Sequence, residues 1–202
     1  WYGGADLSKL HDLTATALYG MHGDVGIIIP HAFFPIVAAH QKADEDNIPL
    51  FGWEEDGWLT MCNAPTVNHA DVRNWFLSMK KRGFRIRQVG HDRKFCREYF
   101  VGMKEAGFVI IDQPQYYFKK SEGFRYLEKM AKNKKLYYLH SDAFEYCIQN
   151  VRAVEKTDDM VQFDKIRPTQ RIDVFDASVF AAIRYLESME STQKAKSWWG
   201  GK

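Results

Sequence analysis

The sequence predicts an α/β domain in which helices flank a mixed β-sheet, and three observations lead to this class. Three β-rich segments joined by short turns come first, at residues 2–8, 13–20 and 25–29. From Phe84 onward, short apolar strands alternate with segments that repeat apolar residues every three or four positions. The 202 residues, 46% of them hydrophobic, suffice for one domain with a sizeable core. Antiparallel strands followed by strand–helix alternation indicate one mixed sheet.

The first half of the chain supplies the antiparallel strands and the segments that cover them. His22, Gly23 and Asp24 mark the turn between the second and third strands. The next expected elements are a loop bracketed by Pro30 and Pro35, a helix over 36–46, a small hairpin over 50–62 and a helix over 69–82. This last helix has apolar residues at i, i+3, i+4 and i+7, and Gly83 ends it.

The second half alternates between strands and helices. Its expected elements are a strand over 84–91, a helix over 95–106, a strand over 108–112, a helix capped by Ser121, a strand over 136–139, a helix from Ser141 that includes Val151, an edge strand over 160–163 and a last helix over 173–189. This order suits a ribonuclease H-like domain over residues 1–190. A flexible tail is expected over 191–202.

Composition excludes several classes of protein. The net charge of +2 is too small to indicate nucleic-acid binding by itself. The 3 cysteines lack CxxC spacing, so they predict neither a disulfide framework nor a zinc site and fit a reducing compartment. No signal peptide and no apolar run near 18 residues is visible, so no membrane segment is expected. The chain contains no P-loop motif and opens at Trp1 without a Met, which favours a domain cut from a longer protein.

The distribution of charge is more informative than the net value. Between Lys80 and Arg97 eight basic residues surround a single acid, Asp92. Signs usually mix on an ordinary solvated surface, which is the alternative reading of this run. A metal-binding carboxylate beside a phosphate-binding track would give the observed pattern.

Two acids stand at the ends of predicted strands. Asp6 follows Gly3 and Gly4, small residues that allow a ligand or backbone to approach closely. It could instead bond its own backbone in the turn, a role that suits Asp12 better. Asp92 ends a strand, where sites gather in open α/β sheets, and could also cap the following helix.

Two further acids open the last helix. Asp173 and Asp176 are three residues apart, so both carboxylates lie on one face of its first turn. An N-cap acid with a second acid at N3 also resembles a capping box, which is the structural alternative. Ala177 and Ala181 form a stripe of small residues that would let this helix lie close to the sheet.

Three acids from distant parts of the chain would suit Mg²⁺ or Mn²⁺, which prefer hard oxygen ligands. Two such ions can clamp the attacking and leaving oxygens of a phosphodiester. The hypothesis from the residues is therefore a metal-dependent nuclease in which Asp6, Asp92 and Asp173 hold the ions. Arg93, Lys94 and Lys165 are candidates for binding flanking DNA phosphates.

The chain resembles the C-terminal nuclease domain of the large terminase subunit of tailed bacteriophages and prophages. The residues that carry the resemblance are Gly3 to Ser8, Asp12 to Ala15, Pro35, Trp53 and Gly57, the strand that ends at Asp92, and Arg171 to Asp173 before an Ala-rich helix. Their order spans nearly the whole chain. His91 departs from the pattern, because the family commonly has an aromatic residue before the second acid.

The resemblance implies a ribonuclease H-like fold and a two-metal endonuclease that cuts concatemeric double-stranded viral DNA. By motif, Asp6, Asp92 and Asp173 carry over as metal ligands, with Asp176 as a fourth. It also implies an N-terminal ATPase domain, a portal and a small terminase subunit as partners, in the cytoplasm of a bacterial host. Two alternatives remain open: another ribonuclease H-like nuclease, acting on junctions or hybrids, and a non-catalytic module that docks on a portal or DNA.

Overall fold

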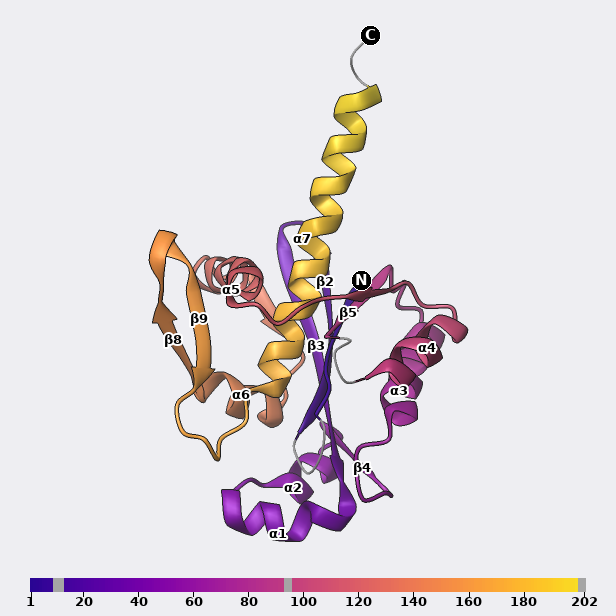
Figure 1. Cartoon of the computed structure of the whole chain (residues 1–202), viewed down its shortest axis with the longest axis vertical. Helices are drawn as coiled ribbons and strands as arrows, with labels where there is room; N and C mark the ends of the chain where they lie inside the picture. The colour runs from indigo at the N-terminus through magenta and orange to yellow at the C-terminus, as the bar shows by residue number, and fades with distance from the viewer. Residues whose placement is uncertain (9–12, 93–95, 200–202) are drawn as a thin grey trace.

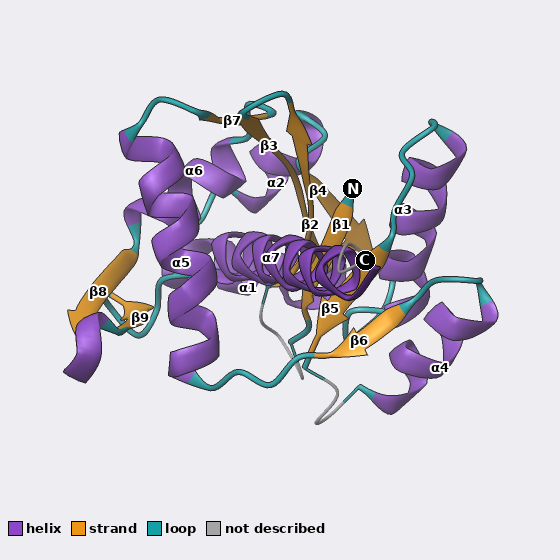
Figure 2. Ribbon diagram, turned by 90° about the horizontal axis from the view of Figure 1, so that it is seen from above, coloured by secondary structure: helices purple, strands orange, loops and turns teal. Residues whose placement is uncertain are grey.

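A computed structural model places these segments in three layers, a central sheet with helices on both of its faces (Figures 1 and 2). The structure describes residues 1–8, 13–92 and 96–199, and side chains as far as residue 192. The seven-stranded sheet has the order β4-β3-β2-β1-β5-β6, and β7 pairs with β3 outside this path. Its strands are β1 (Tyr2–Asp6), β2 (Thr14–His22), β3 (Val25–Pro35), β4 (Leu59–Cys62), β5 (Gln88–His91), β6 (Ile110–Asp112) and β7 (Leu136–Tyr138).

The strand directions agree with the predicted mixed sheet. β1, β2 and β3 form an antiparallel meander, with Tyr2 opposite Tyr19 and Asp6 opposite Ala15. β5 lies parallel to β1, and β6 lies parallel to β5. A second sheet is an antiparallel pair of β8 (Val151–Glu155) and β9 (Val161–Lys165).

The helices bury two separate apolar cores, one on each face. The helices are α1 (Ile36–Asp46), α2 (Leu50–Glu55), α3 (His69–Lys81), α4 (Arg97–Glu105), α5 (Tyr117–Lys132), α6 (Asp142–Gln149) and α7 (Asp173–Trp199). On one face α5, α6 and α7 pack around residues such as Phe180 and Phe144. On the other face α3 and α4 pack around Phe76 and Met103. Within the described residues, no helix has both the length and the hydropathy needed to cross a membrane.

The close approach of α7 to the sheet depends on Gly4. A Cβ atom at this position would lie 2.0 Å from the carbonyl oxygen of Ala177 and 2.6 Å from the backbone nitrogen of Ala181. Only glycine avoids this overlap, so β1 and α7 touch backbone to backbone. The small-residue stripe predicted from Ala177 and Ala181 is therefore confirmed.

Two predictions in the first half are wrong. The loop between Pro30 and Pro35 belongs to the long strand β3. On the side of β3 away from β2, β7 pairs with residues 26–28 and β4 pairs with residues 32–35. Pro30 lies between these two stretches, so its lack of an N–H interrupts neither pairing. The hairpin over 50–62 is a short helix, α2, followed by β4, because Gly57 turns the chain at a φ of 81° after Asp56.

Several boundaries in the second half also differ, and of the strand expected over 84–91 only residues 88–91 form β5. Ser121 lies inside α5, where its hydroxyl accepts a hydrogen bond from the N–H of Val161 (2.8 Å) instead of capping the helix. Val151 starts β8, because α6 ends at Gln149. The last helix continues to Trp199, beyond the expected end at Met189, since no Gly or Pro occurs before Gly200.

Candidate functional site

The ends of β1 and β5 bring two of the candidate acids to one edge of the sheet. These strands are parallel neighbours, with Ala5 opposite His91. Asp6 ends β1, and Asp92 follows β5 directly, so both acids leave the sheet side by side. The carboxyl ends of neighbouring parallel strands are a frequent place for a site in α/β proteins.

The start of α7 reaches the same edge. The hydroxyls of Tyr2 and Ser188 lie 2.7 Å apart, and Gly4 faces Ala177 and Ala181, so α7 runs antiparallel to β1. Two strand residues advance by about 6.6 Å, which equals about four helical residues. Position 6 therefore lies beside the first turn of α7, which carries Asp173 and Asp176.

Both acids of this turn are buried, although a buried carboxylate is costly unless it is paired. Asp176 is 5% exposed, and its Oδ2 forms an ion pair with the ammonium of Lys120 in α5. The other oxygen, Oδ1, has no hydrogen-bond partner among the described residues. Lys120 is itself only 12% exposed and lies 4.6 Å from the ring centre of Phe163. No pattern in the sequence marked Lys120 as part of this site.

A loop between β6 and α5 is anchored across the same edge. The N–H of Gln113 donates to the carbonyl oxygen of His91 (2.8 Å), and its side-chain oxygen accepts from Nε of Arg184 (2.7 Å). Two residues later, Nε2 of Gln115 donates to Oδ1 of Asp6 (3.3 Å). These bonds tie the loop to β5, α7 and β1. Nothing in the sequence marked Gln115, because a glutamine in a loop belongs to no recognisable pattern.

His91 contributes no positive charge beside Asp92 at neutral pH. It is fully buried, and burial lowers the pKa of its imidazole to about 4. The nearby carboxylates of Asp112 and Asp92 oppose this shift without overcoming it. Its ring meets the ring of Tyr99 edge to face at 5.0 Å. The residue that departs from the family pattern thus packs as an aromatic ring.

A buried ion pair fixes the chain just before α7. Nη2 of Arg171 donates to Oδ2 of Asp46 at 2.5 Å, and both side chains are less than one tenth exposed. Asp46 ends α1, so the pair ties this helix to the segment that leads into Asp173. The two residues are 125 positions apart in sequence, which is why periodicity could not reveal the contact.

The predicted phosphate-binding residues divide into two groups. Lys165 ends β9, and it and Asp173 both act electrostatically on the buried thiol of Cys147, so Lys165 lies near the start of α7. Burial is the largest cause that raises the pKa of this thiol. Arg93 and Lys94 lie outside the described residues, as does Asp12.

The candidate carboxylates lie at one edge of the sheet, but in the described part of the chain no three of them have oxygens that all lie within 4.8 Å of one another. Within the described residues, the one set of His, Cys, Asp or Glu side chains whose ligand atoms all lie within 4.8 Å comprises His140, Asp142 and Glu145. In that set each ring nitrogen of His140 already pairs with a carboxylate, at 3.2 and 3.1 Å. The set is therefore explained as a surface ion-pair cluster at the start of α6.

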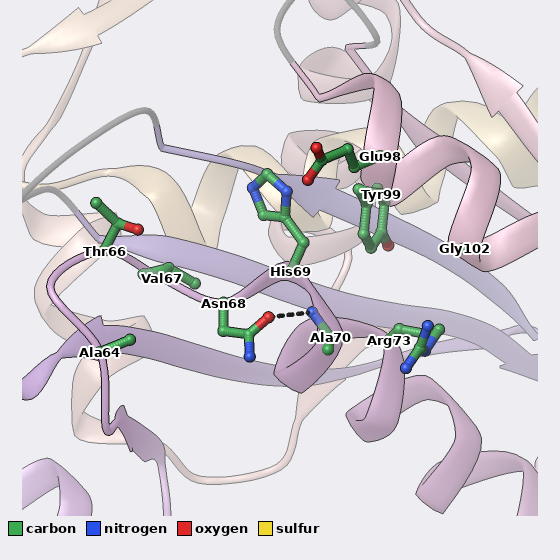
Figure 3. A pocket seen from close by; sticks show the side chains of 10 residues that line it. All are labelled: Ala64, Thr66, Val67, Asn68, His69, Ala70, Arg73, Glu98, Tyr99 and Gly102. Carbon is green, nitrogen blue, oxygen red and sulfur yellow. Dashed lines mark hydrogen bonds between the residues drawn. The ribbon is translucent and has the colours of Figure 1, made fainter.

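A cavity of about 490 Å³ lies on the face of the sheet opposite α7 (Figure 3). It is bounded by the first turn of α3 and by α4, with Asn68 capping the N–H of Ala70 at 2.9 Å. Charged groups of both signs line it, Arg73 and Glu98 among them. Tyr99 forms part of its wall and also packs against His91 of β5. The cavity therefore borders β5, and none of the four candidate ligand acids, all of which the structure describes, lines it.

The strand order β3-β2-β1-β5-β6, with β5 and β6 parallel to β1, gives the domain a ribonuclease H-like fold. The model of the family described as "Terminase large subunit, endonuclease domain" matches residues 1–189. The chain therefore belongs to this family of terminase nuclease domains. A search of curated proteins gave no match.

Solved structures of phage terminases share the fold at low sequence identity. The crystal structure of the HK97 bacteriophage large terminase aligns with a TM-score of 0.82 and 21% identity, over 91% of this chain and 39% of that chain. The large terminase nuclease from thermophilic phage G20c with bound magnesium aligns with a TM-score of 0.54 and 9% identity, over 89% of this chain and 78% of that chain. This chain thus spans about two fifths of the HK97 protein.

Proposed function

We propose that this domain is an endonuclease that cuts concatemeric double-stranded DNA with two divalent metal ions, Mg²⁺ or Mn²⁺. The observation that carries the proposal is the convergence of Asp6, Asp92 and the first turn of α7 at one sheet edge. The crystal structures of the G20c terminase nuclease with magnesium and with cobalt support it, since this relative binds divalent metals with the same fold.

The residues at this edge fit such ions. Carboxylate oxygens are the ligands that Mg²⁺ and Mn²⁺ prefer, and Oδ1 of buried Asp176 has no hydrogen-bond donor among the described residues. We assign Asp6, Asp92 and Asp173 as ligands and Asp176 as a fourth. Bound ions would supply a hydroxide nucleophile near neutral pH and stabilise the charge on the leaving oxygen.

The chain's own residues orient and hold the reactants. Gln115 fixes the carboxylate of Asp6, and Lys120 fixes that of Asp176. Lys165, together with Arg93 and Lys94, holds phosphates on either side of the scissile bond. Contacts of this kind position DNA without reading its sequence, so cleavage has little sequence specificity and binding weakens with salt.

In the full-length protein, the domain works with an N-terminal ATPase domain, a portal and a small terminase subunit in the host cytoplasm. The share of the HK97 large terminase that this chain covers, 39%, leaves room for such an ATPase domain. A junction or hybrid nuclease remains the second candidate, because the same acids would serve it. A comparison of cleavage on linear duplex, four-way junction and RNA–DNA hybrid separates these candidates.

The test of the nuclease proposal is plasmid cleavage in Mn²⁺ by the wild-type chain and by Asp6→Asn and Asp173→Asn. Each variant should lose cleavage while its melting temperature stays near the wild-type value. Asp24→Asn is the matched control, because it removes an exposed carboxylate at the β2–β3 turn, the end of the sheet away from Asp6. Cleavage that survives both site changes would refute the assignment of these acids, whereas a wild-type chain that cleaves no DNA in Mn²⁺ would leave a docking module.

A further inference from the structure

Three consecutive aromatic residues project into solvent where the β6–α5 loop enters α5. Tyr116 is 61% exposed, Tyr117 is 42% exposed and Phe118 is 46% exposed. Large rings gathered on a surface usually mark a binding site, because their exposure to water is unfavourable.

The anchoring of this segment fixes where the rings lie. Gln115, next to Tyr116, donates to Asp6, and Lys120, two residues after Phe118, pairs with Asp176. None of the aromatic residues is more than two positions from an anchored residue, a span of at most about 7 Å. The aromatic run thus borders the edge of the sheet where the candidate ligands of the ions meet.

The geometry of the rings suits a flat partner. Tyr116 and Phe118 are stacked, with ring centroids 5.5 Å apart and planes within 7° of parallel. Tyr117 meets Phe118 edge to face at 6.0 Å, which supports the pair from the side. Tyr116 is the most exposed of the three residues, so it is the one on which a further planar ring would extend the stack.

We infer that Tyr116 and Phe118 form a nucleobase-stacking site beside the metal-binding edge, which receives an unpaired or displaced base next to the bond that is cut. The inference rests on the proposed nuclease function. A duplex whose phosphate reaches Asp6 also covers its surroundings, since its major groove alone is about 12 Å wide, and Tyr116 directly follows Gln115, which donates to Asp6. Lys119, exposed between the rings and Lys120, supplies a positive charge for the adjoining phosphate.

Stacking on this site has a consequence for substrate choice. A base must leave the duplex stack to meet Tyr116, and this step is easiest where the base is mismatched or already single-stranded. The domain should therefore bind single strands and duplexes with an unpaired base more tightly than a perfect duplex of equal length. Every base offers a flat face, so this preference is independent of sequence.

The test measures binding of fluorescein-labelled single-stranded, mismatched and fully paired DNA by anisotropy, with Ca²⁺ in place of Mn²⁺ to prevent cleavage. The double variant Tyr116→Ala/Phe118→Ala should bind the single strand and the mismatched duplex about tenfold more weakly. Tyr116→Phe should bind like the wild type, because it keeps the ring. The matched control is Tyr137→Ala, since Tyr137 is equally exposed (60%) but lies in β7, which pairs with β3 at the end of the sheet away from Asp6.

Two results would overturn the inference. One is unchanged affinity of the double variant for single-stranded and mismatched DNA at an unchanged melting temperature. The other is a wild-type chain that self-associates in sedimentation while the double variant stays monomeric, which would assign the rings to a second copy of the chain. Failure of the nuclease proposal has a different readout, because Asp6→Asn would then still cleave plasmid DNA in Mn²⁺. The anisotropy measurement in Ca²⁺ reports only on DNA binding and therefore tests the stacking site separately.

Discussion

Replacing Gly4 by alanine tests whether contact between β1 and α7 creates the site. The new Cβ would lie 2.0 Å from the carbonyl oxygen of Ala177, so α7 must move by about 1.4 Å to reach an ordinary contact of 3.4 Å. Overpacking of this kind costs about 1–3 kcal/mol, and because the two nearest atoms belong to the backbone of α7, the upper end is expected, about 3 kcal/mol. The shift also moves Asp173 relative to Asp6. A misplacement of about 1 Å can lower a reaction rate by about 100-fold.

Urea unfolding measures the stability of Gly4→Ala, and plasmid cleavage in Mn²⁺ measures its activity at a temperature where it remains folded. Gly52→Ala is the control, because its Cβ would meet only Pro49 Cβ, at 4.0 Å, within helix α2. The control should be slightly more stable than the wild type, by roughly 0.5–1 kcal/mol. Wild-type stability and cleavage in Gly4→Ala would refute the reasoning.

Three further predictions follow from buried polar groups. Asp46→Ala removes the carboxylate that pairs with the buried guanidinium of Arg171 and should cost about 3 kcal/mol in urea unfolding, whereas a loss below about 1 kcal/mol would contradict the buried pair. Lys120→Met removes the cation that pairs with Asp176, so Mn²⁺ should raise the melting temperature more than in the wild type; an equal rise would argue against Asp176 as a ligand. Burial lowers the pKa of His31 in the folded chain to about 4, from 6.5 in the unfolded chain. The unfolded chain therefore takes up the proton at a higher pH, and the free energy of unfolding falls as the pH drops from 6.5 towards 4. The loss is about 3 kcal/mol, and His31→Gln should lack this part of the pH dependence between pH 7.5 and 4.5.

Much of the fold could be predicted from the sequence because its periodicities are local. The helix over 69–82 and the turn at Gly83 follow from apolar spacing, and the structure has α3 at His69–Lys81. The prediction failed where tertiary contacts override local signals. Pro30 occurs in a strand because it lies between the stretches of β3 that pair with β7 and with β4, and Ser121 occurs inside a helix because Val161 satisfies its hydroxyl.

The sequence indicates the acids of the candidate site but not the residues around them. Strand ends and a helix start have sequence signals, so they marked Asp6, Asp92 and Asp173 as candidate ligands, which stays a prediction. Gln115 and Lys120 have none, since their roles arise from how the β6–α5 segment crosses the end of the sheet. The same limit hid the aromatic run beside them, whose exposure depends on tertiary structure.

The most direct test of the account is an anomalous difference map from a crystal of this domain soaked in Mn²⁺. The account predicts manganese peaks coordinated by oxygens of Asp6, Asp92 and Asp173, at the edge between β1, β5 and α7. Manganese bound only elsewhere, such as at the surface cluster of His140, Asp142 and Glu145, with these three carboxylates pointing apart, would contradict the central claim.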